Sequence, residues 1–231
     1  MQQPTYLIIR NFADIVFVTS KPDTKRFPKQ LDKKGVVIVR GGVTLNKGIK
    51  KKIKKTYDTV FQGRFHPQKG VLELTDIWKI LVNKKPDAKL VMIGDGPLMK
   101  SVKLKVRSEK LEKNIILTGY LFDGEEKYRI FSKSKIVVHP AIFDSGGMAS
   151  MEAMAFGLPC VGFNLSSYKY YYPKGMIKAK AGHLQEFADK ILELISNKKI
   201  YERVKEEALD LVSHNHSWEY RSRQIISRML E

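Results

Sequence analysis

Short apolar segments alternate with amphipathic segments from residue 57 to the end of the chain. The apolar segments are rich in β-branched residues, which is typical of buried strands, and they cover 57–61, 90–93, 115–117, 136–138 and 160–163. The other segments repeat apolar residues at helical spacing and predict helices at about 70–83, 97–110, 123–133, 147–156, 182–196, 199–212 and 217–230. Strands that alternate with helices predict an α/β fold built on a doubly wound parallel sheet, with helices over both faces.

The first 56 residues do not follow this alternation. Two strand candidates, Ile15–Val18 and Val36–Val39, flank the polar, proline-containing segment Lys21–Lys34. So short a length of chain cannot bury an independent core. We therefore interpret residues 1–56 as the remnant of a further domain followed by a basic linker.

The formal net charge is +18, which fits a protein that binds nucleic acid, anionic lipid or an anionic substrate. Lysines concentrate in Lys47–Lys55, and a run of this kind is more often a solvated segment than a binding surface. The run lacks the interleaved aromatic residues of a single-strand groove, which disfavours nucleic acid and leaves peripheral contact with an anionic membrane open. The single cysteine, Cys160, gives no disulfide framework and no secretory signal is visible, so we expect a cytoplasmic protein.

Two cations lie close together in the loop Gly63–Gly70, between the first long strand and the helix after it. Arg64 and Lys69 stand at opposite ends of this loop, so their side chains can converge. Two cations beside a helix N-terminus suit a diphosphate, whose negative charge grows as it departs from a sugar. The alternative is a solvated basic loop in which Pro67 is a turn residue.

Two carboxylates, Asp144 and Glu152, stand eight residues apart around the expected start of a helix near Gly147. The first backbone N–H groups of such a helix have no internal partner and favour an anion. Asp144 then lies in the loop before the helix, and Glu152 projects from its second turn. One loop and one helix end could thus hold a phosphate, a sugar and a ribose, which together make a nucleotide sugar.

Other candidate chemistry is weaker. The turn Gly94–Pro97 lacks the third glycine of a dinucleotide fingerprint, which argues against an NAD-binding domain. His139 ends a strand, where site residues collect, but the histidines show no metal-ligand spacing and no Asp-x-Asp pair occurs, so we expect neither a metal nor a cofactor. The tyrosine-rich segment Tyr168–Pro173 is best explained as a partly buried aromatic edge, with a surface patch as the alternative.

Taken together and in this order, several motifs resemble the donor-binding half of retaining GT-B glycosyltransferases of group 1, a family that includes glycogen synthases and mannosyltransferases. The motifs that carry the resemblance are Gly63-Arg64 with Lys69-Gly70, Gly94-Asp95-Gly96-Pro97, Thr118-Gly119-Tyr120, His139-Pro140, and Asp144 to Glu152 followed by Ala153-Met154-Ala155-Phe156-Gly157-Leu158-Pro159. The resemblance covers about residues 57–230 and implies a Rossmann-like domain, the C-terminal half of a GT-B fold.

The resemblance also implies roles for the matching positions. Arg64 and Lys69 would bind the diphosphate, Glu152 would bind the ribose hydroxyls, and Asp144 would hold hydroxyls of the donor sugar. The other donor contacts that it implies are at Gly63, Gly94, Gly119, Tyr120, His139, Ser145, Gly146, Gly147, Met148 and Ala149. Family members work without a metal and retain the anomeric configuration, because the acceptor attacks from the leaving-group side and the departing phosphate takes its proton.

Two departures from the family pattern bear on function. Asp144 replaces the usual glutamate, which shortens the reach to the sugar by one methylene. Only the last strand of the N-terminal acceptor domain is recognisable, so the chain divides into a remnant with its linker at 1–56, a nucleotide-sugar-binding domain at 57–215 and a C-terminal crossing helix at 216–231. We expect this helix to expose an apolar stripe, and we expect transfer to need the acceptor domain.

Two alternatives stay open. The chain could be a non-catalytic donor-binding or partner module of a split glycosyltransferase, which pairs with a separate acceptor-domain chain. It could instead bind polyanions or membrane surfaces through its positive charge. The base, the sugar and the acceptor are not specified by the sequence.

Overall fold

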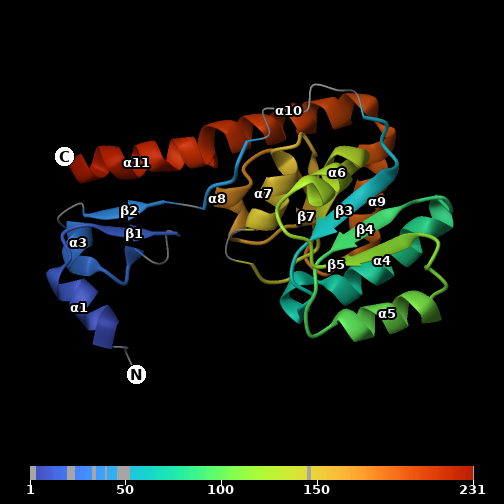
Figure 1. Cartoon of the computed structure of the whole chain (residues 1–231), viewed down its shortest axis with the longest axis horizontal. Helices are drawn as coiled ribbons and strands as arrows, with labels where there is room; N and C mark the ends of the chain where they lie inside the picture. Colours follow the sequence, from blue (N-terminus) through green and yellow to red (C-terminus); the bar gives the residue numbers. More distant parts are fainter. Residues whose placement is uncertain are drawn as a thin grey trace. The chain divides into compact units, whose positions relative to one another are not determined.

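The computed structural model describes residues 4–19, 24–32, 35–39, 41–45, 53–144 and 147–230 of the chain, which folds as two compact units (Figure 1). One unit combines the N-terminal segment up to Val43 with the C-terminal segment from His214. The other runs from Thr44 to Ser213. The three-part division that the sequence suggests stays a prediction.

The larger unit is built on a six-stranded sheet in which each strand runs parallel to its neighbours. Its strands are β3 (Tyr57–Gln62), β4 (Leu90–Ile93), β5 (Ile115–Gly119), β6 (Ser134–His139), β7 (Cys160–Phe163) and β8 (Met176–Ala179). They lie in the order β5-β4-β3-β6-β7-β8. The chain therefore builds outward from β3, returns to its other side with β6 and continues outward, which makes the sheet doubly wound.

Helices cover both faces of this sheet (Figure 1). They are the 3₁₀ turn η1 (Pro67–Lys69), α4 (Val71–Lys84), α5 (Met99–Ser108), α6 (Glu125–Lys133), α7 (Met148–Met154), α8 (Tyr168–Tyr171), α9 (Leu184–Ser196) and α10 (Lys198–Asn215). Helix α4 packs against α5 and α9, and Phe61 and Met92 join the core beneath them around the fully buried Trp78. Because side chains alternate along a strand, the buried Val60 and Val137 point to the other face, where α6 and α7 contact β3 and β6.

The predicted α/β fold with a parallel sheet is confirmed, and the sequence patterns missed only short elements. Strand β8 was not predicted because it has four residues and the polar Lys178 interrupts its apolar run. The tyrosine-rich segment contains the one-turn helix α8, in which Tyr168 is buried and Tyr170 is exposed. The segment is therefore the partly buried aromatic edge that we expected. Helix α5 begins at Met99, so Pro97 lies in the turn before it and not at its first position.

The smaller unit holds α1 (Pro4–Phe12), β1 (Val16–Val18), α3 (Pro28–Asp32), β2 (Val36–Ile38) and α11 (Trp218–Leu230). Strands β1 and β2 pair in parallel over a small core that contains Phe27. The two short helices α1 and α3 were not predicted. Most of the lysine-rich run falls on residues 46–52, outside the described residues.

Helix α11 begins where the C-terminal segment meets the linker. The ring of Trp218 lies so close to Gly42 that a Cβ there would sit 2.6 Å from the indole, and Arg221 donates to the carbonyl oxygen of Gly41. Ile226, Met229 and Leu230 are exposed, as expected for an apolar stripe on this helix. No helix in the described part of the chain has the length and apolar character needed to span a membrane.

Candidate functional site

The candidate site lies at the carboxyl ends of β3 and β6, the two neighbouring strands at which the strand order reverses. Ligands of doubly wound sheets bind at this point, because the loops after the two strands diverge and leave a crevice. The loop after β3 leads through η1 into α4 and carries Lys69. The loop after β6 leads into α7 and carries Asp144, and Glu152 follows on α7 itself.

Asp144 is the centre of one group of polar contacts, which we call the Asp144 cluster and define as Lys69, His139, Asp144 and Gly147. Its Oδ2 atom lies 2.7 Å from Nζ of Lys69 and 2.8 Å from Nε2 of His139, and its Oδ1 atom accepts a hydrogen bond of 2.9 Å from the backbone N–H of Gly147. A carboxylate only accepts hydrogen bonds, so its contact with His139 assigns the proton of a neutral imidazole to Nε2. Three of the predicted site residues, Lys69, His139 and Asp144, therefore lie together in the structure, whereas the convergence of Arg64 with Lys69 stays a prediction.

Close backbone contacts hold the two loops of this cluster together. Gly70 has φ of +64°, and a Cβ at this position would lie 2.0 Å from the carbonyl oxygen of Pro140. Any larger residue would push η1 away from the end of β6. The loop after β6 is also tied to the segment after β7, since Ser167 donates a hydrogen bond of 2.7 Å to the carbonyl oxygen of Asp144. Lys69 is thus placed beside Asp144 by the backbone.

Two buried tyrosines support the same loop. Gly147 precedes α7 and has φ of +55°. Tyr172 donates a hydrogen bond to the carbonyl oxygen of this glycine. The ring of Tyr168 packs against the ring of His139, with 5.7 Å between their centroids. Burial raises the pKa of both phenols, and the negative charge of Asp144 contributes to the rise. Both phenols are therefore neutral near pH 7.

Glu152 is the centre of a second group, the Glu152 cluster, defined as Gln62, Asp123, Lys127 and Glu152. Its Oε2 atom accepts hydrogen bonds of 2.8 Å from Nε2 of Gln62 and 2.9 Å from Nζ of Lys127. Lys127 also donates to Asp123. Burial alone would lower the pKa of the Lys127 ammonium, but its hydrogen bonds to Asp123 and Glu152 outweigh burial and raise the pKa above its ordinary value. The cluster therefore contains a charged, buried lysine.

The remaining predicted site residues fall into three groups. Gly63, Gly94 and Gly119 lie side by side at the ends of β3, β4 and β5, because the N–H of Gly63 bonds to the carbonyl of Ile93 and the N–H of Gly94 bonds to that of Gly119. Exposed side chains are Arg64, in the loop after β3, and Tyr120, whose ring meets that of Phe122 edge-on at 5.0 Å. Met148 and Ala149 open α7, whereas Ser145 and Gly146 lie outside the described residues.

Three residues of the two clusters escaped the sequence interpretation. Gln62 is the last residue of a strand and carried no signal of its own. Asp123 and Lys127 stand four residues apart, a spacing that predicts an ordinary pair on an exposed helix face, whereas the Lys127 side chain is 3% exposed. Tyr172 was predicted only as part of a partly buried aromatic edge, and its hydrogen bond to the carbonyl oxygen of Gly147 was not predicted. In the described part of the chain, no three His, Cys, Asp or Glu residues are grouped as a metal site would require.

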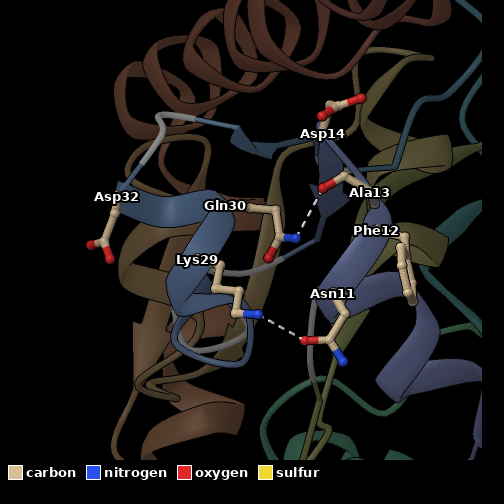
Figure 2. Close-up of a pocket in the computed structure, with 7 residues that line it drawn as sticks. All are labelled: Asn11, Phe12, Ala13, Asp14, Lys29, Gln30 and Asp32. Atoms are coloured by element: carbon tan, nitrogen blue, oxygen red, sulfur yellow. Dashed lines mark hydrogen bonds between the residues drawn. The ribbon is translucent and has the colours of Figure 1, made fainter.

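A separate cavity of about 300 Å³ lies in the smaller unit (Figure 2). Its lining comes from the end of α1, the residues after it and α3, and comprises Asn11, Phe12, Ala13, Asp14, Lys29, Gln30 and Asp32. Gln30 donates hydrogen bonds of 2.9 Å to the carbonyl oxygens of Arg10 and Ala13, and Lys29 donates to Asn11. These contacts join α3 to the end of α1, and none of the predicted site residues lines the cavity.

Comparison with known proteins decides which family this arrangement belongs to. A family model described as "Glycosyl transferases group 1" matches residues 42–210, which include both clusters. The chain belongs to this family. The resemblance drawn from the motifs is confirmed, and the chain is part of a family of enzymes that transfer sugars.

Curated and solved relatives agree with this assignment. The UDP-Gal:α-D-GlcNAc-diphosphoundecaprenol α-1,3-galactosyltransferase of Escherichia coli is 30% identical over 140 residues, which are 57% of this chain and 35% of that protein. A point mutant of S. aureus TarM, crystallised with fondaparinux, α-GlcNAc-glycerol and UDP, has a TM-score of 0.81 at 20% identity over 98% of this chain and 46% of its own. The C-terminal domain of LpcC from Francisella tularensis has a TM-score of 0.62 at 24% identity over 76% of this chain and 96% of its own. The solved structures share the fold, and the chain spans about a third of the length of its curated relative.

Proposed function

We propose that this chain binds a nucleotide-diphosphate sugar at the carboxyl edge of its sheet and takes part in metal-independent, retaining transfer of the sugar. The observation that carries the proposal is the meeting of two carboxylates and a lysine at the ends of β3 and β6. Asp144 is 2.7 Å from Lys69 in one cluster, and Glu152 presents a partly exposed carboxylate in the other. This is the combination of charges that a diphosphate and two sets of sugar hydroxyls require.

The cations are suited to the diphosphate. Lys69 lies in the segment after β3, at the carboxyl edge of the sheet, and its side chain is 28% exposed, so its ammonium is accessible to a ligand. Arg64 lies exposed in the same loop and provides planar donors for phosphate oxygens. As the glycosidic bond breaks, negative charge accumulates on the diphosphate, and both cations would stabilise it more strongly than they stabilise the bound donor.

The carboxylates are suited to hydroxyl groups. Glu152 would accept hydrogen bonds from the ribose, and Asp144 would accept them from the transferred sugar. In the transfer step, a bond forms between the acceptor oxygen and the anomeric carbon while the bond from that carbon to the diphosphate breaks. The diphosphate leaves with the bonding electrons and takes the acceptor's proton. Attack from the side of the leaving group retains the anomeric configuration.

The acceptor would be bound by sequence beyond these two units. Relatives such as the E. coli galactosyltransferase are about three times as long as the part that matches here. The resemblance to GT-B enzymes implies a further domain that binds the acceptor. We propose that an acceptor-binding domain, on the same polypeptide or on a separate chain, completes the enzyme. The nature of the acceptor would depend on that domain.

Binding of nucleotide sugars tests the proposal directly. We would measure thermal unfolding and calorimetric affinity of the chain with UDP-, GDP- and ADP-sugars in buffer without divalent cations. A ligand that binds only the folded state stabilises it, by about 2.7 kcal/mol at a hundredfold excess over Kd. Arg64→Ala should abolish most of this stabilisation, because it removes a diphosphate ligand from an exposed side chain without disturbing a buried contact.

Lys105→Met is a matched control. Lys105 also pairs with a carboxylate, that of Asp76 at 2.6 Å, but it joins α5 to α4 away from both clusters. Its replacement should leave nucleotide-sugar binding unchanged. The absence of stabilisation with each donor at millimolar concentration would contradict the proposal. Salt-sensitive binding to heparin or anionic vesicles in the same experiment would favour the polyanion alternative.

A further inference from the structure

The Glu152 cluster contains two donors that have no role in the family pattern described above. We propose that Lys127 and Gln62 are positioning residues for nucleotide binding: they occupy one oxygen of Glu152 and so leave the other oxygen to accept the ribose hydroxyls. This inference rests on the proposed function, and it adds the residues that determine how Glu152 presents its carboxylate.

The donors meet on the same carboxylate oxygen. Nε2 of Gln62 is 2.8 Å from Oε2 of Glu152, and Nζ of Lys127 is 2.9 Å from that atom. A carboxylate oxygen has two lone pairs in its plane, so these two hydrogen bonds fill Oε2. An incoming hydroxyl therefore finds no acceptor site there.

The other oxygen is open. Within the described residues, no hydrogen-bond donor contacts Oε1, and the Glu152 side chain is 35% exposed. Both lone pairs of Oε1 can accept, which matches the two neighbouring hydroxyls of a ribose. The cluster thus presents a carboxylate in one orientation, with one filled and one free oxygen, before a ligand arrives.

Lys127 is held in place in a way that a surface lysine is not. Its side chain is 3% exposed, and its ammonium donates to Asp123 as well as to Glu152. The ammonium also lies 5.7 Å from the ring centre of Tyr128 and 5.8 Å from that of Phe131. Because water cannot replace these contacts around a buried charge, the ammonium has no alternative position of similar free energy.

Gln62 supplies the second fixed donor from a different element. It is the last residue of β3, while Lys127 lies on α6 and Glu152 on α7, so three elements converge on the carboxylate. Only the NH₂ group of the amide can donate to a carboxylate, which assigns the orientation of the side chain. Its own amide oxygen is buried and has no hydrogen-bond partner among the described residues. The contact with Glu152 is therefore the one that orients Gln62.

Nucleotides with and without ribose hydroxyls separate a positioning role from a structural one. We would measure calorimetric affinities for UDP, GDP and ADP, choose the base that binds best to the wild-type chain, and repeat the titration with the 2′,3′-dideoxy form of that nucleotide. Lys127→Met should weaken binding of the ribose form about tenfold, the loss expected for a charge-assisted hydrogen bond, and leave the dideoxy form within about twofold of wild type. Gln62→Leu should have the same selective effect with a smaller loss.

Two further variants complete the set. Lys127→Arg keeps the charge and the donors and should bind the ribose form more like wild type than like Lys127→Met. Lys105→Met should bind both forms as wild type does, since its ion pair lies on α5 and α4. Circular dichroism would confirm that each variant is folded, and if Lys127→Met is not, Gln62→Leu and Lys127→Arg decide the question.

The outcomes distinguish this inference from the function on which it rests. If the wild-type chain binds none of the nucleotides, the proposed function fails and this inference fails with it. If the wild-type chain binds and prefers the ribose form, but Lys127→Met and Gln62→Leu keep that preference, only the inference is overturned. Equal weakening of binding of the ribose and dideoxy forms would also overturn it, because a loss of affinity that does not depend on the ribose hydroxyls would indicate a structural role.

Discussion

Asp144 and Glu152 carry the same charge at the same edge of the sheet, yet their surroundings differ. Asp144 accepts on both oxygens, from Lys69, His139 and the N–H of Gly147, and its side chain is 6% exposed. Among the described residues, Glu152 accepts on one oxygen only, and its side chain is 35% exposed. The Asp144 carboxylate is thus enclosed by its own protein, whereas the Glu152 side chain is partly exposed.

This difference separates two tasks. A carboxylate that already accepts hydrogen bonds on both oxygens stabilises the loops around it, and a ligand must compete with those contacts. A carboxylate with one free oxygen is prepared for a ligand at little cost. In this chain Asp144, the shorter of the two side chains, is paired with Lys69. If Lys69 binds the diphosphate of a donor, it would have to give up part of this contact with Asp144.

The largest expected effect comes from replacing each carboxylate by its amide. In Asp144→Asn, one amide oxygen cannot serve donors from Lys69, His139 and Gly147, and the new NH₂ group would face another donor. We expect a loss of about 2–3 kcal/mol in the free energy of unfolding, measured by urea denaturation. In Glu152→Gln, the amide oxygen can keep both donors while the NH₂ group turns outward, and Asp123 still offsets the charge of Lys127, so the loss should be smaller, about 1–2 kcal/mol.

The pair of variants is its own control, because each removes one negative charge and keeps the shape of the side chain. Equal losses in the two variants would show that the carboxylates are not differently engaged. A larger loss in Glu152→Gln would reverse the comparison.

The two tyrosines that support the Asp144 cluster give a smaller contrast. Tyr172→Phe removes the hydrogen bond to the carbonyl oxygen of Gly147 and should cost about 1–2 kcal/mol in the free energy of unfolding. The hydroxyl of Tyr168 is buried and has no hydrogen-bond partner of normal geometry among the described residues, although it lies near the carboxylate of Asp144, so Tyr168→Phe should cost less than Tyr172→Phe at pH 7. Urea denaturation of both variants tests this, and a cost of similar size for Tyr168→Phe would mean that its hydroxyl has a partner.

The fold and the two clusters differ in how far they could be predicted from the sequence. Most strands and helices could be predicted from the spacing of apolar residues. A strand that is buried on both faces is a short apolar run, and a helix with one buried face repeats apolar residues at helical spacing. The meeting of Lys69 with Asp144 follows once the strand order places β3 beside β6, since loops after neighbouring parallel strands meet at the same edge. Because Lys69 and Asp144 each follow a predicted strand, the sequence placed both residues in loops at the carboxyl edge of the sheet.

The partners of Glu152 were not foreseeable from the sequence. Whether Lys127 lies in solvent or beneath Glu152 depends on how α6 is rotated about its axis, and its spacing from Asp123 is compatible with both. The role of Tyr172 depends on the path of a segment distant from Gly147 in sequence. Such contacts depend on how separate elements pack against one another. The residue types and their spacing within one segment do not reveal that packing.

Alkaline pH tests the buried phenols as a pair. An unfolded tyrosine ionises near pH 10. Burial raises the pKa of Tyr168 and Tyr172 in the folded protein, so above about pH 10 the folded state binds more protons than the unfolded state and its stability falls as the pH rises. Between pH 9 and pH 10.5 each phenol should account for about 0.8 kcal/mol of this loss. Tyr168→Phe should reduce the loss by that amount, and an unchanged pH dependence would show that its phenol ionises in the folded protein.

The smallest expected effect concerns the outer partner of Lys127. Asp123 is 75% exposed, so its ion pair with Lys127 is weakened by solvent on one side, whereas the pair of Lys127 with Glu152 is shielded. Asp123→Asn keeps an oxygen for the Lys127 ammonium and should change the free energy of unfolding by less than about 0.5 kcal/mol, as for most exposed ion pairs. Nucleotide affinity, measured by calorimetry, should stay within about twofold of wild type, because Glu152 keeps its donors from Lys127 and Gln62. A loss in Asp123→Asn as large as that in Lys127→Met would show that Asp123, and not burial, holds the lysine against Glu152.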